Sequence, residues 1–251
     1  MPIVVDAVEA RNRRTAVEVK GYTQTVREED QYFATLYMGA PPATAAHALG
    51  EGIDKSLPQA YLVEQPAGAT VPPHFHDTDQ FQVFVEGVAA FGKQVLRPVS
   101  VHYAGGHTPY GPIVTTERGT HYFTLRANWD SGGKPMPASR DKLQRGRACH
   151  RLAENLHDLD ARGGTEVLPV EDSGLGAMLY ELAPNETQVL DLAREGGGQY
   201  ALVTCGSVCY DHSTLVERSC LYRAADEVPL SLTGGAEGGT VLLMQFPKSG
   251  H

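Results

Sequence analysis

The chain has 251 residues with 21 basic and 30 acidic side chains, which give a formal net charge of −9. No segment concentrates the lysines and arginines that a phosphate backbone attracts, so we expect no nucleic-acid partner. The length allows one large domain or two of about 100 to 150 residues. The 27 glycines and 16 prolines are spread along the chain, which favours short strands joined by tight turns.

The first twenty residues are charged throughout and lack an apolar core followed by a cleavage site, so we expect no secretion. No run approaches the roughly 20 apolar residues that span a bilayer. We therefore expect a cytoplasmic protein without a membrane partner. Cys205, Cys209 and His212 could be interpreted as a metal cluster, but they fall on a strand and its turn. We favour small apolar core residues for the four cysteines. These are Cys149, Cys205, Cys209 and Cys220.

Strand signals dominate the chain and helix is scarce. Residues 30–39 (DQYFATLYMG) form a plausible short strand before the loop-like segment 40–52. Short β-branched or aromatic runs, bounded by glycine and proline, then fill two regions. These regions are 60–129 and 177–247. The charged segment 139–164 between them has no strong strand pattern, so we expect a connector with a helical turn or two around Leu152 to Leu159.

An internal repeat relates the two regions. Gln80 is followed by FQVFVE and Gly87, and Gln199 is followed by YALVTC and Gly206, at an offset of 119 residues. Both glutamines precede an aromatic residue, and both glycines end a predicted strand. The simplest account is a duplicated antiparallel β unit. We expect an N-terminal domain over 1–145 and a C-terminal domain over 146–251.

The segment GATVPPHFHDTDQFQVFVEG, residues 68–87, carries the chemistry. His74 and His76 lie two residues apart, so on a strand both side chains point to the same face. Two imidazoles on one face can bind a single metal ion. A third ligand must come from elsewhere, and Gln80 and Gln82 follow a short polar turn on the expected next strand.

The spacing from Gly68 through His74, His76 and Gln80 to Gly87 resembles the first motif of the cupin superfamily. The family usually has a glutamate where Gln80 stands. Together with the duplication, this resemblance implies an all-β bicupin, with two tandem jelly-roll barrels and little helix. The second barrel is expected to be degenerate. Asp191 and Ala193 stand where the first repeat has its two histidines, and Gln199 has no partners.

The resemblance also implies a divalent metal ion in the first barrel, held by His74, His76 and Gln80. The further ligand is His102, on a predicted strand, or His107, beside a glycine turn; His121 is a weaker candidate. Imidazole and oxygen ligands suit iron, which we expect first, and also nickel, manganese, copper and zinc. A neutral amide in place of glutamate leaves the ion its full double charge, which makes it a stronger Lewis acid.

Three functions are consistent with these residues. The first is an oxygenase for a small enol, diketone or phenolic substrate, with Gln82 orienting the substrate. The second is a metal-dependent isomerase, lyase or hydrolase, in which a residue such as Tyr110 moves a proton. The third is a binding module without turnover. Arg126 is a candidate clamp for a substrate carboxylate, or simply a solvated arginine at a strand end. By analogy with cupin barrels we expect a homodimer.

Overall fold

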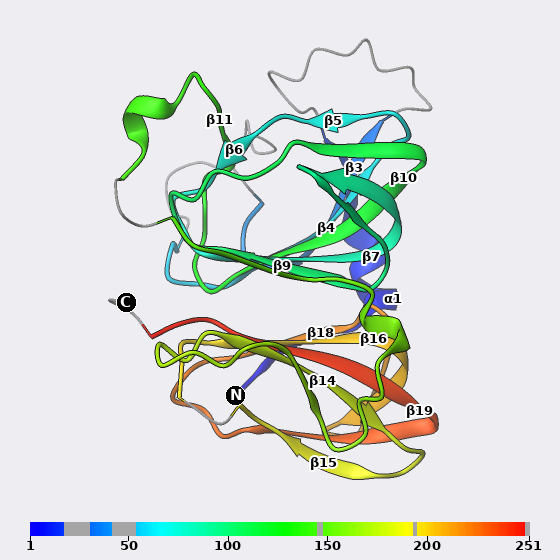
Figure 1. Cartoon of the computed structure of the whole chain (residues 1–251). Helices are drawn as coiled ribbons and strands as arrows, with labels where there is room; N and C mark the ends of the chain where they lie inside the picture. The colour runs from blue at the N-terminus through cyan, green and yellow to red at the C-terminus, as the bar shows by residue number, and fades with distance from the viewer. Residues whose placement is uncertain (18–30, 42–53, 145–147, 193–194, 249–251) are drawn as a thin grey trace. The chain divides into compact units, whose positions relative to one another are not determined.

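The computed structural model describes residues 1–17, 31–41, 54–144, 148–192 and 195–248 (Figure 1). The described part of the chain is almost entirely β-structure. Its single α-helix is α1 (Ala7–Ala10), and short 3-10 turns lie at Arg11–Arg13, Arg140–Lys142 and Leu156–Asp158. The all-β prediction is therefore confirmed. No helix in the described ranges has the length and apolar character needed to cross a membrane.

The contacts divide the chain into two compact units, one of residues 13–155 and one of residues 1–12 with 156–251. This division differs from the expected boundary at 145/146. The boundary lies later because β12 (His150–Ala153) pairs with β9 (Ser100–Ala104) of the first unit. The first residues belong to the second unit because β1 (Ile3–Val5) pairs with β18 (Cys220–Arg223).

The N-terminal unit is built on one antiparallel sheet in the order β12-β9-β7-β10-β4-β3-β2. Two further strands extend it, β5 on β10 and β8 on β7, and a separate pair joins β6 to β11. The remaining strands are β2 (Arg14–Val17), β3 (Tyr32–Met38), β4 (Gln59–Gln65), β5 (Thr70–Val71), β6 (His74–Phe75), β7 (Gln80–Phe91), β8 (Gln94–Leu96), β10 (Ile113–Arg126) and β11 (Lys134–Pro135). Strand β3 confirms the strand expected at 30–39. The loop expected over 40–52 lies mostly outside the described residues.

The C-terminal unit repeats this plan in the order β1-β18-β16-β19-β14-β13, with β15 on β19 and β17 on β16. Its further strands are β13 (Thr165–Leu168), β14 (Gly176–Leu182), β15 (Thr187–Leu190), β16 (Gln199–Tyr210), β17 (Ser213–Val216) and β19 (Leu230–Gln245). The two repeat glutamines begin β7 and β16, which are both 12 residues long. The predicted duplication is therefore visible in the strands themselves.

Each unit has its own buried core. The N-terminal core includes Phe84, Phe91 and Ile113. The C-terminal core includes Ala201 and Val203. All four cysteines are free thiols. Cys220 is buried as expected of a core residue, whereas Cys205 is exposed. The expectation of core packing is therefore wrong for Cys205.

Candidate small-molecule site of the N-terminal barrel

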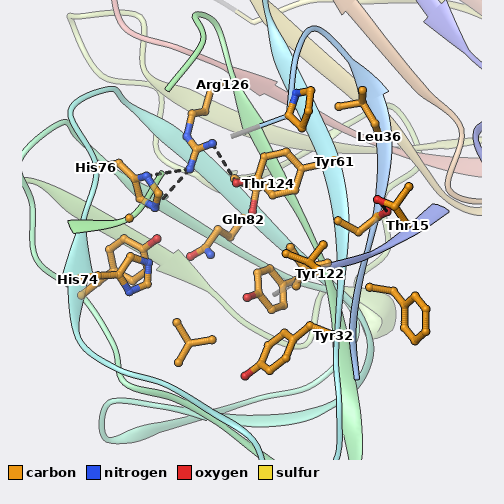
Figure 2. A pocket seen from close by; sticks show the side chains of 18 residues that line it. Thr15, Tyr32, Leu36, Tyr61, His74, His76, Gln82, Tyr122, Thr124 and Arg126 are labelled. Carbon is orange, nitrogen blue, oxygen red and sulfur yellow. Dashed lines mark hydrogen bonds between the residues drawn. The ribbon is translucent and has the colours of Figure 1, made fainter. Parts of the chain in front are cut away.

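A pocket with a cavity volume of about 150 Å³ opens in the N-terminal unit (Figure 2). Aromatic and aliphatic side chains make most of its walls, and a few polar side chains gather at one end. The aromatic residues are Tyr32, Phe33, Tyr61, Tyr110 and Tyr122. The polar end is formed by His74, His76, Gln82 and Arg126. Five of the residues selected from the sequence, these four and Tyr110, thus line one cavity.

His74 and His76 flank Phe75 on the short strand β6 and its end, and both side chains reach the pocket. Their ring centroids are 5.2 Å apart. Nδ1 of His74 lies 2.8 Å from the carbonyl oxygen of Pro72, and Nδ1 of His76 lies 2.8 Å from Oδ1 of Asp130. Each acceptor holds a proton on Nδ1, so Nε2 of each ring is left unprotonated.

Both rings are neutral at pH 7. Burial lowers the pKa of His74 to about 4. Burial and the nearby charge of Arg126 lower the pKa of His76 to about 3. The two imidazoles are therefore acceptors and not cations, which is the state required of a metal ligand or of a base.

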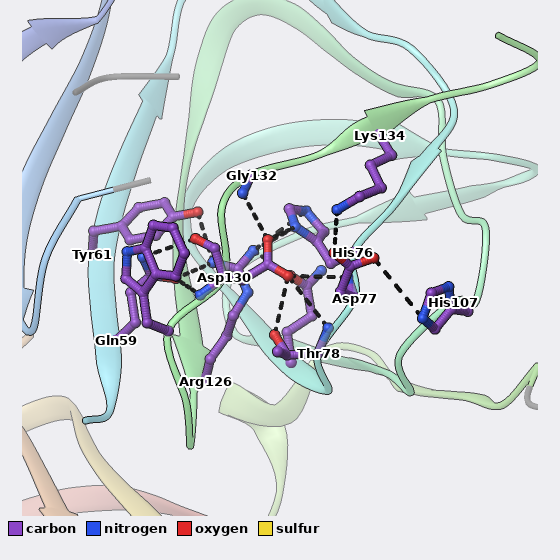
Figure 3. A network of polar contacts seen from close by, with 12 residues as sticks. Gln59, Tyr61, His76, Asp77, Thr78, His107, Arg126, Asp130, Gly132 and Lys134 are labelled. Carbon is purple, nitrogen blue, oxygen red and sulfur yellow. Dashed lines mark hydrogen bonds and ion pairs between the residues drawn. The ribbon is translucent and has the colours of Figure 1, made fainter. Parts of the chain in front are cut away.

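Asp130 follows β10 and is the counter-charge of the site (Figure 3). Besides His76, its carboxylate accepts hydrogen bonds from the backbone N–H groups of Asp77 at 3.0 Å and Gly132 at 2.7 Å. Burial alone would raise the pKa of this carboxyl, but the hydrogen bond from His76 and the charge of Arg126 hold it well below its usual range. Asp130 is therefore a buried, ionised carboxylate.

Arg126, at the end of β10, is fully buried, so the alternative of a solvated arginine is wrong. Its Nη1 donates to Oε1 of Gln59 at 2.6 Å and to the hydroxyl of Tyr61 at 3.1 Å. Its Nη2 donates to Oε1 of Gln80 at 2.7 Å and lies 3.0 and 3.3 Å from the two ring nitrogens of His76. A carboxylate clamp would therefore have to displace a protein acceptor.

The guanidinium stays charged in this buried position. Burial alone would lower the pKa of Arg126, but the oxygens of Tyr61 and Asp130 raise it above its ordinary value. Buried charges are tolerated only when they are paired and fully hydrogen-bonded. Asp130 supplies the counter-charge, and four side chains lie within hydrogen-bond distance of Nη1 and Nη2 of Arg126, which offsets much of this cost.

Gln80 and Tyr110 complete the polar end. The amide nitrogen of Gln80 donates to the hydroxyl of Tyr110, so this one amide joins the phenol to the guanidinium. Tyr110 is held beside β6 by two backbone hydrogen bonds with His74, at 3.0 and 3.1 Å. Its ring centroid lies 4.5 Å from that of His74 and 5.0 Å from that of His102.

The candidate fourth ligands do not join the histidine pair. His102 is fully buried on β9, with Nδ1 3.2 Å from Oε1 of Gln82, and its Nε2 has no hydrogen-bond partner among the described residues. His107 lies on the turn after β9, where its Nε2 is 3.9 Å from Oδ1 of Asp77. His121 lies 3.1 Å from a carboxylate oxygen of Glu86. None of the three lines the pocket.

The donor set suits a metal ion only in part. His74 and His76 have the tautomer of metal ligands, but the oxygen of Gln80 is bonded to Arg126. An ion about 2.1 Å from that oxygen would lie no more than about 4.8 Å from Nη2 of Arg126. Two positive charges this close repel by several kcal/mol in a protein interior. No three His, Cys, Asp or Glu side chains of the described chain are grouped to hold an ion. The arrangement therefore leaves the predicted metal centre incomplete, and the ion stays a prediction.

The second barrel has a neutral amide where the first has this cation. Gln199 pairs with Gln245 across β16 and β19, and their side chains are hydrogen-bonded at 2.6 Å. Gln245 thus stands 119 residues after Arg126, at the offset that relates Gln199 to Gln80. Asp191 is exposed, and Ala193 lies outside the described residues.

Asp130, Gln59 and Tyr61 belong to the site but were not among the residues selected from the sequence. Asp130 is 54 positions from His76, and Gln59 is 67 positions from Arg126. These contacts depend on which strands become neighbours. Only the pairing of β4 with β10 brings Gln59 opposite Arg126.

No protein-family model and no curated protein sequence matches the chain. Solved structures do match it. A putative dioxygenase from Nostoc punctiforme PCC 73102 is 11% identical, with a TM-score of 0.62, over 100% of this chain and 84% of that one. Pirin YhhW from Escherichia coli, in complex with nickel(II), is 14% identical, with a TM-score of 0.59, over 99% and 100%. Quercetin 2,3-dioxygenase from Acinetobacter baumannii is 14% identical, with a TM-score of 0.51, over 95% and 80%.

These neighbours are cupin-fold proteins. The chain has the same all-β jelly-roll cupin fold, as the sequence predicts, and it carries two such units. The structural similarity establishes the shared fold. At identities of 11 to 14% the fold does not determine the function, which must be argued from the residues of the site.

Proposed function

We propose that the N-terminal barrel is the active site of an enzyme for a small planar molecule with an enol, diketone or phenolic oxygen. The observation that supports this most strongly is the division of the pocket between aromatic walls and one polar end. Aromatic walls suit a planar apolar ligand, and a few convergent polar groups fix its orientation. The polar end holds a buried cation, two neutral imidazoles and a phenol.

The chemistry that this end supports is proton transfer next to an oxygen. The charge of Arg126 stabilises negative charge that develops on a substrate oxygen, because the interior screens it less than water does. The unprotonated Nε2 of His74 can accept a proton, and the hydroxyl of Tyr110 can donate one. Gln82, which lines the same pocket, can orient the substrate. These roles are those of an isomerase or lyase.

The test is ligand binding to the whole protein, with a panel of small diketones, enols and phenols. Binding is measured by calorimetry, and turnover by loss of the substrate's ultraviolet absorbance. We expect Tyr110→Phe to weaken binding about tenfold, as loss of one hydrogen bond to a buried oxygen would. Tyr210→Phe, in the C-terminal unit, is the control and should leave binding unchanged. Failure of every member of the panel to bind would reject the proposal.

A metal-dependent oxygenase is the second candidate. It is supported by the acceptors that hold both histidine Nδ1 atoms and by the two dioxygenases among the solved structures. In it, His74 and His76 would hold a divalent ion, iron first, and the ion would activate dioxygen. Oxygen uptake in the presence of the panel, with and without iron(II), distinguishes the two candidates. Uptake that requires iron would favour the oxygenase.

A further inference from the structure

We infer that Arg126 takes the place of the metal ion as the fixed cation of this site, so that the N-terminal barrel works without a divalent metal. The inference rests on the proposed function and makes it more specific. A guanidinium stabilises an enolate or phenolate oxygen by charge, but it has no second oxidation state. The substrates are therefore molecules activated by loss of a proton.

The first argument is position. Nη2 of Arg126 contacts the oxygen of Gln80 at 2.7 Å and lies 3.0 to 3.3 Å from both ring nitrogens of His76. Gln80 and His76 are two of the side chains that the sequence pattern assigns to an ion. Figure 2 shows the guanidinium directed at His76 on the pocket side of the barrel. The cation and an ion on Gln80 would compete for one oxygen.

The second argument is charge. Asp130, bonded to Nδ1 of His76, supplies one negative charge, and Arg126 supplies one positive charge. Gln80 is neutral where the family pattern has a carboxylate. The polar end is therefore already balanced without an ion. A divalent ion would add two uncompensated positive charges to a buried site, which is unfavourable unless an anion enters with it.

The third argument is the internal repeat. Gln245 occupies in the second barrel the place that Arg126 has in the first, but it accepts a hydrogen bond from Gln199, whereas Arg126 donates one to Gln80. The oxygen of Gln199 accepts instead from Nε of Arg223 on β18. The barrel therefore accepts a neutral amide at this position. Both barrels place a buried arginine on the repeat glutamine, but the carboxylate beside Arg223 is that of the half-exposed Asp191. Only the first barrel has the arginine at this position, together with a buried counter-charge. Such a pair is costly to bury, and a role in the site accounts for it.

The test is cobalt(II) binding to the chelator-treated full chain, followed by calorimetry and by visible absorption. We expect the wild type to show no stoichiometric binding at micromolar cobalt. Arg126→Gln copies the second barrel, removes the repulsion and should bind one cobalt about tenfold or more tightly than the wild type. Adding His74→Ala to this variant should abolish the gain. Arg118→Gln, an exposed site on the same strand, is the control for loss of a positive charge.

Tight one-to-one binding of cobalt by the wild type, or an Arg126→Gln variant that folds without any gain, would overturn the inference. If Arg126→Gln does not fold, the wild-type titration still decides. Arg126→Lys provides a second variant that keeps the charge, and its binding of cobalt should remain weak.

The panel of small molecules separates this inference from the proposed function. Binding that requires added metal would reject only the role of Arg126. No binding under any condition would reject the pocket as a substrate site, and the cobalt titration would still test the cation.

Discussion

Oδ1 of Asp130 accepts a hydrogen bond from Nδ1 of His76 at 2.8 Å, and Nη2 of Arg126 lies 3.0 Å from the same Nδ1 and 3.3 Å from Nε2 (Figure 3). The ring therefore contacts a buried anion and a buried cation together. The carboxylate fixes the tautomer of the ring, and burial together with the charge of Arg126 lowers its pKa and keeps it neutral. These contacts also make the three side chains dependent on one another for stability.

Asp130→Asn should lower the free energy of unfolding of the N-terminal unit by about 3 kcal/mol or more, because it leaves Arg126 as a buried charge without its partner. Trp129, the single tryptophan, lies next to this residue in the sequence. Its fluorescence during urea unfolding therefore reports on this unit. Asp77→Asn is the control, since the carboxylate of Asp77, which pairs with Lys134, is nearly half exposed, and should cost less than about 1 kcal/mol. Similar losses in the two variants would contradict the buried charge pair.

Gly133→Ala should impair the pocket while leaving the barrel folded. A Cβ at this position would lie 2.9 Å from Cδ2 of His74, so the ring must move away from its place in the pocket. We expect ligand affinity to fall by about tenfold, a change that displacement of a positioning group readily produces. Gly105→Ala is the control, because its added Cβ meets only ordinary contacts of 3.5 Å or more. Unchanged affinity in Gly133→Ala would show that His74 does not contact the ligand.

His102 should make the protein less stable in mild acid. Burial lowers its pKa from 6.5 to about 3, so between these values the unfolded chain binds a proton that the folded chain does not. The stability it contributes is complete above about pH 6.5 and is lost as the pH falls. At pH 5 the loss is about 2 kcal/mol.

His102→Gln removes this group, so the free energy of unfolding should fall less steeply between pH 7 and pH 5 than in the wild type. A slope remains because His74 and His76 act in the same direction. The exposed His157 provides the control variant His157→Gln. Equal slopes for the wild type and His102→Gln, in urea unfolding followed by Trp129 fluorescence, would contradict a buried neutral His102.

The sequence predicts the local features of this molecule well. The alternation around His74 and His76 places both rings in one pocket, and the two glutamine-to-glycine segments become the equivalent strands β7 and β16. Both depend on the spacing of nearby residues. The choice between His102 and His107 could not be made locally, because it depends on strand pairing: β9 beside β7 sets His102 opposite Gln82, 20 positions away.

The role of Arg126 was equally hidden. From the sequence alone, an arginine at the end of a strand is predicted to be solvated. The structure surrounds Arg126 with Gln59, Tyr61 and Asp130. Two of these come from strand β4, whose pairing with β10 supplies the register. Charge burial is a property of the assembled sheet and is not readable from one segment.

The pairing of β1 with β18 has a consequence for folding order. The edge of β18 is covered by residues Ile3–Val5, and Ile3 pairs with Tyr222, which lies 219 positions further along the chain. During synthesis β1 therefore cannot pair until β18 has been made, and the whole of residues 13–155 lies between the two strands in the sequence. A fragment that begins at residue 156 would leave the backbone N–H and C=O groups of this edge uncovered, where they can pair with another chain. A single cut between the two units thus leaves the C-terminal unit without β1, although its other strands are all present.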